Sequence, residues 1–98
     1  MAVAIQFEFR GTTIEKYDEL NECTGFLPSG PMPPGGLFHW VTKTDDGFRT
    51  IDVWESREAF EQFFNRRVLP RYQEVGITNP PEVQFFEVHN YFASRHLR

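Results

Sequence analysis

The segment that decides the fold is Ile51-Asp52-Val53-Trp54-Glu55-Ser56-Arg57-Glu58-Ala59-Phe60-Glu61-Gln62-Phe63, because its hydrophobic period changes in the middle. Up to Trp54 apolar and polar residues alternate, as they do in a strand, and after Ser56 the apolar residues recur at helical spacing. Ser56 stands where a helix N-cap belongs, and the acidic Glu58 lies in the first turn, where it complements the helix dipole. The segment therefore predicts a strand followed at once by a helix.

The rest of the chain extends this pattern to six elements. Strands are predicted over residues 2–9, 37–44, 48–55 and 82–92, and helices over residues 14–24 and from Ser56 to about Leu69. The first helix should turn Ile14, Tyr17, Leu20 and Thr24 inward and end at Gly25. Asp45-Asp46-Gly47 predicts a hairpin between the two middle strands, and Pro70 should kink or restart the second helix. The order β-α-β-β-α-β predicts a ferredoxin-like α+β fold, in which a four-stranded antiparallel sheet carries both helices on one face.

The domain predicted in this way covers residues 1–92, and residues 93–98 form a short tail. Within the domain, residues 26–36 contain four prolines and three glycines, a composition that excludes regular structure. Phe26, Leu27 and Met32 indicate that this loop packs against the protein, and its length is typical of a lid or a wrapped functional loop. Its role stays open at this level.

The last predicted strand is apolar on both sides. Val83, Phe85 and Tyr91 share one side, and Phe86, Val88 and Phe92 share the other. A sheet that is apolar on both faces needs a cover on both, whereas two helices on one face leave the other open. We therefore predict a homodimer in which two sheets pack against each other.

Composition excludes several classes of partner and location. The net charge of −4 argues against nucleic acid and anionic membranes, which both require a basic surface. The single cysteine, Cys23, excludes an intrachain disulfide and a cysteine-based zinc site. The N-terminus does not resemble a signal peptide, and no apolar run is long enough to span a membrane, so a cytoplasmic location is expected.

Val53-Trp54-Glu55-Ser56, the following Glu58-Ala59-Phe60, and Gly35-Gly36-Leu37 at the start of a strand carry a family resemblance. Together with the element order, they resemble the antibiotic-biosynthesis-monooxygenase-like group of the dimeric α/β-barrel superfamily. This group includes cofactor-free oxygenases of polycyclic phenols and haem-degrading monooxygenases. The haem-degrading members carry a second tryptophan and a haem-ligating histidine. In this chain the tryptophan position falls on Phe63 and the histidine position falls near Gln73, beside Tyr72, so both residues are absent. Axial ligation needs an imidazole or a comparable donor, so we expect no haem and no other cofactor.

The middle hairpin carries the candidate catalytic residues. Closing it with a turn at Asp46-Gly47 pairs Val41 with Asp52 and His39 with Trp54, so that His39 lies diagonal to Asp52. A carboxylate beside an imidazole fixes its tautomer and raises its pKa, as a general base requires. The alternative is a purely structural His–Asp hydrogen bond at an interface. We expect the apolar face, with Phe38, Trp40, Ile51 and Val53, to lie against the helices, and the face of His39, Asp52 and Trp54 to line the dimer barrel.

Trp54, Tyr72, His89 and Tyr91 are the predicted substrate-binding residues. The tyrosines have polar tips that need partners when buried. His39 and His89 lie on strands at opposite edges of the predicted sheet, so only a dimer could bring them together, and we expect no metal site.

Two functions follow as hypotheses. One is a cofactor-free monooxygenase-like enzyme acting on a small aromatic or phenolic substrate, with His39 as the base. The other is a non-catalytic homodimer that binds a small ligand or acts as a scaffold.

Overall fold

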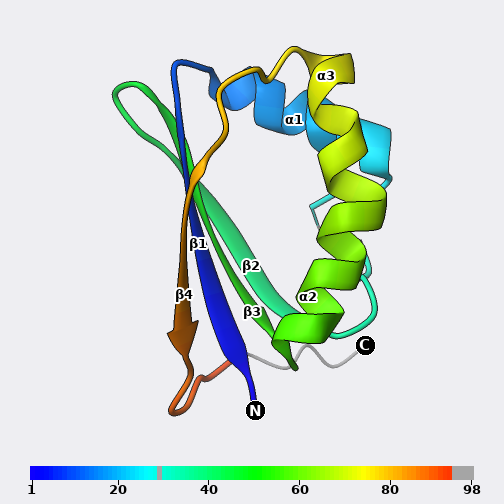
Figure 1. Ribbon diagram of the computed structural model, residues 1–98, viewed down its shortest axis with the longest axis vertical. Helices are drawn as coiled ribbons and strands as arrows, with labels where there is room; N and C mark the ends of the chain where they lie inside the picture. Colours follow the sequence, from blue (N-terminus) through cyan, green and yellow to red (C-terminus); the bar gives the residue numbers. More distant parts are fainter. Residues whose placement is uncertain (29, 94–98) are drawn as a thin grey trace.

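The protein folds as a four-stranded antiparallel sheet with its helices on one side, in the predicted order (Figure 1). The computed structural model describes residues 1–28 and 30–93. This arrangement is a ferredoxin-like α+β fold, as predicted. The elements are β1 (Val3–Arg10), α1 (Ile14–Thr24), β2 (Gly36–Lys43), β3 (Gly47–Trp54), α2 (Arg57–Phe63), a π-helical turn (Phe64–Val68), a 3₁₀ turn (Leu69–Arg71), α3 (Tyr72–Val75) and β4 (Glu82–Glu87).

Local sequence signals account for the ends of the helices. The Ser56 side chain accepts a hydrogen bond of 3.1 Å from the Ala59 backbone N–H, so it caps α2 as predicted. Gly25 ends α1 in the left-handed conformation with φ 82°, which a glycine adopts without steric cost. The disturbance expected at Pro70 is also present, because α2 widens into the π-helical turn and then tightens into the 3₁₀ turn that contains this proline.

The strands lie in the order β2-β3-β1-β4, so β2 and β4 form the two edges of the sheet, as predicted. The predicted pairing of the hairpin is wrong by two residues. Thr44 and Gly47 close the hairpin, which places His39 directly opposite Asp52 and Trp40 opposite Ile51. Gly47 is the first residue of β3. A Cβ at this position would lie 2.0 Å from the Phe9 carbonyl oxygen on β1. Close packing between strands, not turn geometry, therefore requires the glycine.

The assignment of the two sheet faces is corrected by the structure. The face with His39, Asp52 and Trp54 is covered by the helices, and the face with Phe38, Trp40, Ile51 and Val53 is the open one. Trp54 is buried against Phe60 of α2, whereas the side chains of Phe38 and Trp40 are 40% and 43% exposed. Apolar content alone predicts the wrong face, because the covered face is more polar at this hairpin than the open face.

β4 is shorter than predicted, since it ends at Glu87 instead of residue 92. Glu87 pairs with Val3, the first residue of β1, so the ladder ends together with β1. One more backbone hydrogen bond, 3.1 Å from the Val88 N–H to the Ala2 carbonyl oxygen, follows the last pair. His89 and Tyr91 consequently lie in an irregular segment.

The core lies between the sheet and the helices and is mostly aromatic. Phe7 and Phe9 of β1 contact Phe60, Phe64 and Tyr72 from the helical layer, with ring centroids 5.3–5.9 Å apart. The predicted inward side of α1 is confirmed, because Tyr17, Leu20 and Thr24 are buried. In the part of the chain that the structure describes, no helix is both long and apolar enough to cross a membrane. Of the predicted tail, residues 94–98 lie outside the described residues.

Candidate active site

His39 and Asp52 meet on the covered face of the sheet because β2 and β3 pair them directly. In this register their side chains project from neighbouring strands toward the helices, and Trp54 follows on the same face two residues after Asp52. The sequence correctly predicted that all three residues lie on the same face of the sheet. The direct pairing brings His39 and Asp52 closer than the diagonal arrangement that was expected.

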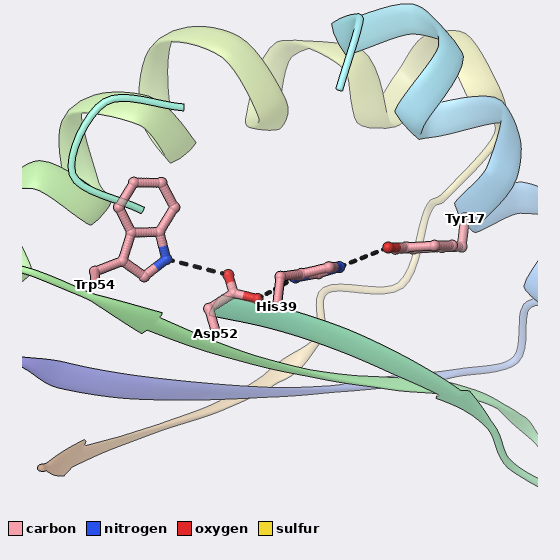
Figure 2. A network of polar contacts seen from close by, with 4 residues as sticks. All are labelled: Tyr17, His39, Asp52 and Trp54. Carbon is pink, nitrogen blue, oxygen red and sulfur yellow. Dashed lines mark hydrogen bonds and ion pairs between the residues drawn. The ribbon is translucent and has the colours of Figure 1, made fainter. Parts of the chain in front are cut away.

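The polar side chains form one continuous network, shown in Figure 2. One Asp52 carboxylate oxygen is hydrogen-bonded to His39 Nδ1, and the other accepts a hydrogen bond of 3.3 Å from the Trp54 indole N–H. On its far side, His39 Nε2 lies 2.5 Å from the Tyr17 hydroxyl oxygen. Asp52 therefore positions both the imidazole and the indole ring, and the chain Tyr17–His39–Asp52–Trp54 joins α1 to the sheet.

Tyr17 enters this network from the N-terminal half of α1, where it is 8% exposed. Its ring lies end to end with the His39 ring, with an angle of 10° between the two planes, and packs against Phe48 of β3 (Figure 2). Burial raises the pKa of the Tyr17 phenol. Hydrogen bonding to the Asn21 side chain lowers this pKa, and the negative charges of Asp52 and Asp18 raise it further. The phenol is thus held in its protonated form at neutral pH and can act as a hydrogen-bond donor.

A cavity of about 500 Å³ opens beside the network, within the size range of sites for small organic ligands. Aromatic rings from the sheet and from the helical layer form much of its wall, and polar atoms come from the network and from Asp18, Asn21 and Thr50. Leu27, Met32 and the prolines between them close one side, so the Pro/Gly-rich loop is part of the cavity wall. A third of the His39 side chain remains exposed, at 33%, so a ligand can reach it.

The structure brings together four of the six residues predicted for the site. His39, Asp52, Trp54 and Tyr72 line the cavity, and burial raises the pKa of the Tyr72 phenol far above its usual range, with a further contribution from Asp52. His89 and Tyr91 lie in the exposed segment after β4 and are not among the residues that line the cavity. The cavity lies within a single chain, because the helices cover the sheet face that was expected to line a dimer barrel.

Tyr17 is the residue of the site that sequence patterns missed as a functional residue. Helical periodicity placed it on the inward side of its helix, and a buried tyrosine needs a hydrogen-bond partner. That partner, His39, stands 22 residues away on another element, so only the packed structure reveals the contact.

Histidines and carboxylates do not gather into a metal cluster in the described part of the chain. Among residues 1–28 and 30–93, no group of three or more His, Cys, Asp or Glu side chains is arranged to hold a metal ion. His39 on β2 and His89 after β4 belong to opposite edges of the sheet. The polar network is instead suited to proton transfer, because a carboxylate orients one imidazole nitrogen and leaves the other as a proton acceptor.

Comparison with solved structures assigns the fold. No protein-family model matches this chain, and no curated protein sequence matches it. SnoaB, a cofactor-independent oxygenase from Streptomyces nogalater, aligns with a TM-score of 0.61 and 15% identity over 95% of this chain and 97% of its own. A Deinococcus radiodurans structure, named as a putative antibiotic biosynthesis monooxygenase, aligns with a TM-score of 0.58 and 12% identity over 98% of this chain and 100% of its own.

A third structure carries a ligand. The monooxygenase from the ActVA-Orf6 gene of Streptomyces coelicolor, in complex with nanaomycin D, has a TM-score of 0.53 and 19% identity, covering 96% of this chain and 92% of its own. The chain therefore has an antibiotic-biosynthesis-monooxygenase-like fold. The neighbours with this fold include named monooxygenases, one of them described as cofactor-independent.

Proposed function

We propose that this protein is a cofactor-independent monooxygenase-like enzyme that oxidises a small aromatic phenol in the cavity between its sheet and its helices. The observation that carries the proposal is the His39–Asp52 pair at the wall of an aromatic cavity of about 500 Å³. In this proposal His39 is the general base, Asp52 orients it, and Trp54 and Tyr72 contribute to the substrate-binding wall. The likeness of fold to SnoaB, which is named as a cofactor-independent oxygenase, supports the reaction class.

The proposed reaction begins with removal of the phenolic proton by His39. Hydrogen-bonded to the Asp52 carboxylate, the imidazole accepts this proton at Nε2, and the carboxylate stabilises the imidazolium that forms. The phenolate is electron-rich and reduces dioxygen directly. One oxygen atom becomes a carbonyl of the quinone product, and the other leaves as water together with hydrogen atoms from the substrate. The substrate supplies all the electrons, so the balance needs no added reductant.

The aromatic walls favour a flat ligand for a physical reason. Rings such as Phe60, Phe64 and Trp54 present apolar faces and edges that hold an aromatic substrate and exclude water from it. Exclusion of water strengthens the electrostatic interaction between the phenolate and the imidazolium that results from proton transfer.

The open face of the sheet supports a homodimer as the functional unit. Phe38, Val53, Ala4 and Phe86 form a row across all four strands on this face, and the next row contains Trp40 and Ile51. Among them Phe38, Trp40 and Phe86 are 40%, 43% and 49% exposed. A contiguous apolar patch of this kind marks an interaction surface. We propose that a second copy of the chain covers it, sheet against sheet.

The experiment measures oxygen uptake with naphthols, dihydroxynaphthalenes and hydroxyanthracenes, together with the incorporation of labelled dioxygen into the product. We expect wild-type protein to place one labelled atom in each product molecule. His39→Ala should lower the rate by about 10²–10⁴-fold, the usual contribution of a general base. His89→Ala is the matched control, because it removes the same ring from a site outside the cavity.

Two results would contradict this proposal. Full oxygen uptake in His39→Ala would exclude His39 as the base, and binding of phenols without any oxygen uptake would favour the non-catalytic ligand-binding alternative. Equal losses in His39→Ala and His89→Ala would show that the site extends beyond the cavity of one subunit.

A further inference from the structure

We propose that Tyr17 is a catalytic residue, whose hydroxyl contacts the ligand hydroxyl and passes its proton to His39. This inference rests on the proposed function, since it assigns the path by which the ligand proton reaches the base. The geometry that carries it is the 2.5 Å contact between the Tyr17 oxygen and His39 Nε2, at the wall of the cavity.

The positions of the hydrogen atoms follow from the partners of His39. Asp52 binds Nδ1 and its carboxylate can only accept, so Nδ1 carries the ring hydrogen and Nε2 presents its lone pair. The Tyr17 hydroxyl therefore donates its hydrogen to Nε2. A ligand that approaches the base from the cavity finds this lone pair already occupied. The Tyr17 oxygen, in contrast, keeps lone pairs that can accept a hydrogen bond from a ligand hydroxyl.

Tyr17 is held too firmly to be a plug that the ligand displaces. It lies in the N-terminal half of α1, it is buried, its hydroxyl is hydrogen-bonded to His39, and its ring packs against Phe48 with a centroid distance of 5.4 Å. Displacement of the side chain would break these contacts. Transfer through the hydroxyl requires only that hydrogens move along bonds that already exist.

The proposed step balances as two coupled proton transfers. The ligand O–H bond breaks and its proton forms a new O–H bond on Tyr17, while the original Tyr17 O–H bond breaks and that proton bonds to Nε2. Tyr17 is neutral before and after the step. The net products are a ligand phenolate and a His39 imidazolium beside Asp52, and no electron transfer is involved.

The test uses 2-naphthol, a fluorescent phenol that becomes a strong acid on excitation, bound to wild-type, Tyr17→Phe and His39→Ala proteins. We expect naphtholate emission from ligand bound to wild-type protein and its loss in His39→Ala. In Tyr17→Phe the rate of naphtholate appearance should fall by at least about tenfold, or 1.36 kcal/mol in barrier. The affinity for 2-methoxynaphthalene, which has no proton to transfer, should change much less, because the ring of residue 17 remains.

A second measurement needs only the wild-type chain. The rate of naphtholate appearance should curve when it is plotted against the deuterium content of the solvent, because two protons move together. A straight line, or unchanged naphtholate emission in Tyr17→Phe with loss in His39→Ala, would overturn the relay and leave His39 as a direct base. Emission that persists in His39→Ala would instead overturn the proposed function, on which the relay depends.

Discussion

Successive side chains of each strand point to opposite faces of the sheet, and the two faces differ in polarity and in cover. The covered face holds the polar side chains of His39 and Asp52 in an aromatic core. Each has a hydrogen-bond partner, and Tyr17 of α1 is one of these partners. On the open face, Phe38, Trp40 and Phe86 are large apolar side chains without a cover among the described elements. The contrast teaches that apolar content alone does not identify the face of a sheet that the helices cover.

The strongest test of this contrast removes the same aromatic ring from each face. Phe60 packs against Phe7, Trp54, Phe64 and Phe85, so we expect Phe60→Ala to lower the free energy of unfolding by about 3–5 kcal/mol. Phe86→Ala should cost less, and its cost should grow with protein concentration, because only a dimer buries that ring. Urea denaturation at several protein concentrations measures both. Equal losses in the free energy of unfolding, independent of protein concentration, would contradict the assignment of the faces.

A charge placed on the open face tests the proposed interface more directly. Trp40→Glu puts a carboxylate in the apolar rows, and we expect it to weaken association by roughly 2–4 kcal/mol, or about 30- to 1,000-fold in the dimer dissociation constant. Analytical ultracentrifugation gives the mass and the constant. Gln73→Glu, which adds the same charge on the helical side, is the control and should remain dimeric. A monomeric wild-type protein at micromolar concentration would refute the dimer itself.

The smallest expected effect concerns the buried hydroxyls of the covered face. The pKa of Tyr72 is raised in the folded protein by burial, while in the unfolded chain this phenol ionises near its ordinary value of 10. Its stabilising contribution is complete below pH 10 and is lost as the pH rises above it, by at most about 1.4 kcal/mol per pH unit. Tyr72→Phe should therefore flatten the fall in stability between pH 10 and 11, measured by urea denaturation. An unchanged slope would show that this phenol is not protected by burial.

Local signals predicted those features that depend on neighbours along the chain. Ser56 caps α2, Gly25 ends α1 and Pro70 disturbs the second helix, because each of these effects acts within one turn of the backbone. The residues that share a face on β2 and β3 were also correct, since a shift of two residues in pairing leaves every side chain on its own face. The direct His39–Asp52 contact required the true position of the turn.

The predictions were wrong where contacts between distant parts of the chain determine the structure. The pattern Asp46-Gly47 predicts a turn, but the glycine is needed where β3 passes close to Phe9 of β1. The final strand was predicted to reach residue 92, but its ladder ends at the pair of Glu87 with Val3, where β1 begins. Neither constraint is visible in the local sequence, because each is imposed by a strand far away in the chain.

The amino-acid sequence by itself determined the order of the elements, the helix ends and the sharing of a face by His39, Asp52 and Trp54. These follow from backbone geometry, in which a period of two or 3.6 residues places side chains on faces. The tertiary structure alone decided which face the helices cover, that Tyr17 meets His39, and that the loop after α1 closes a cavity. Such outcomes depend on how layers pack and on which contacts satisfy buried polar groups, and these are properties of the whole chain.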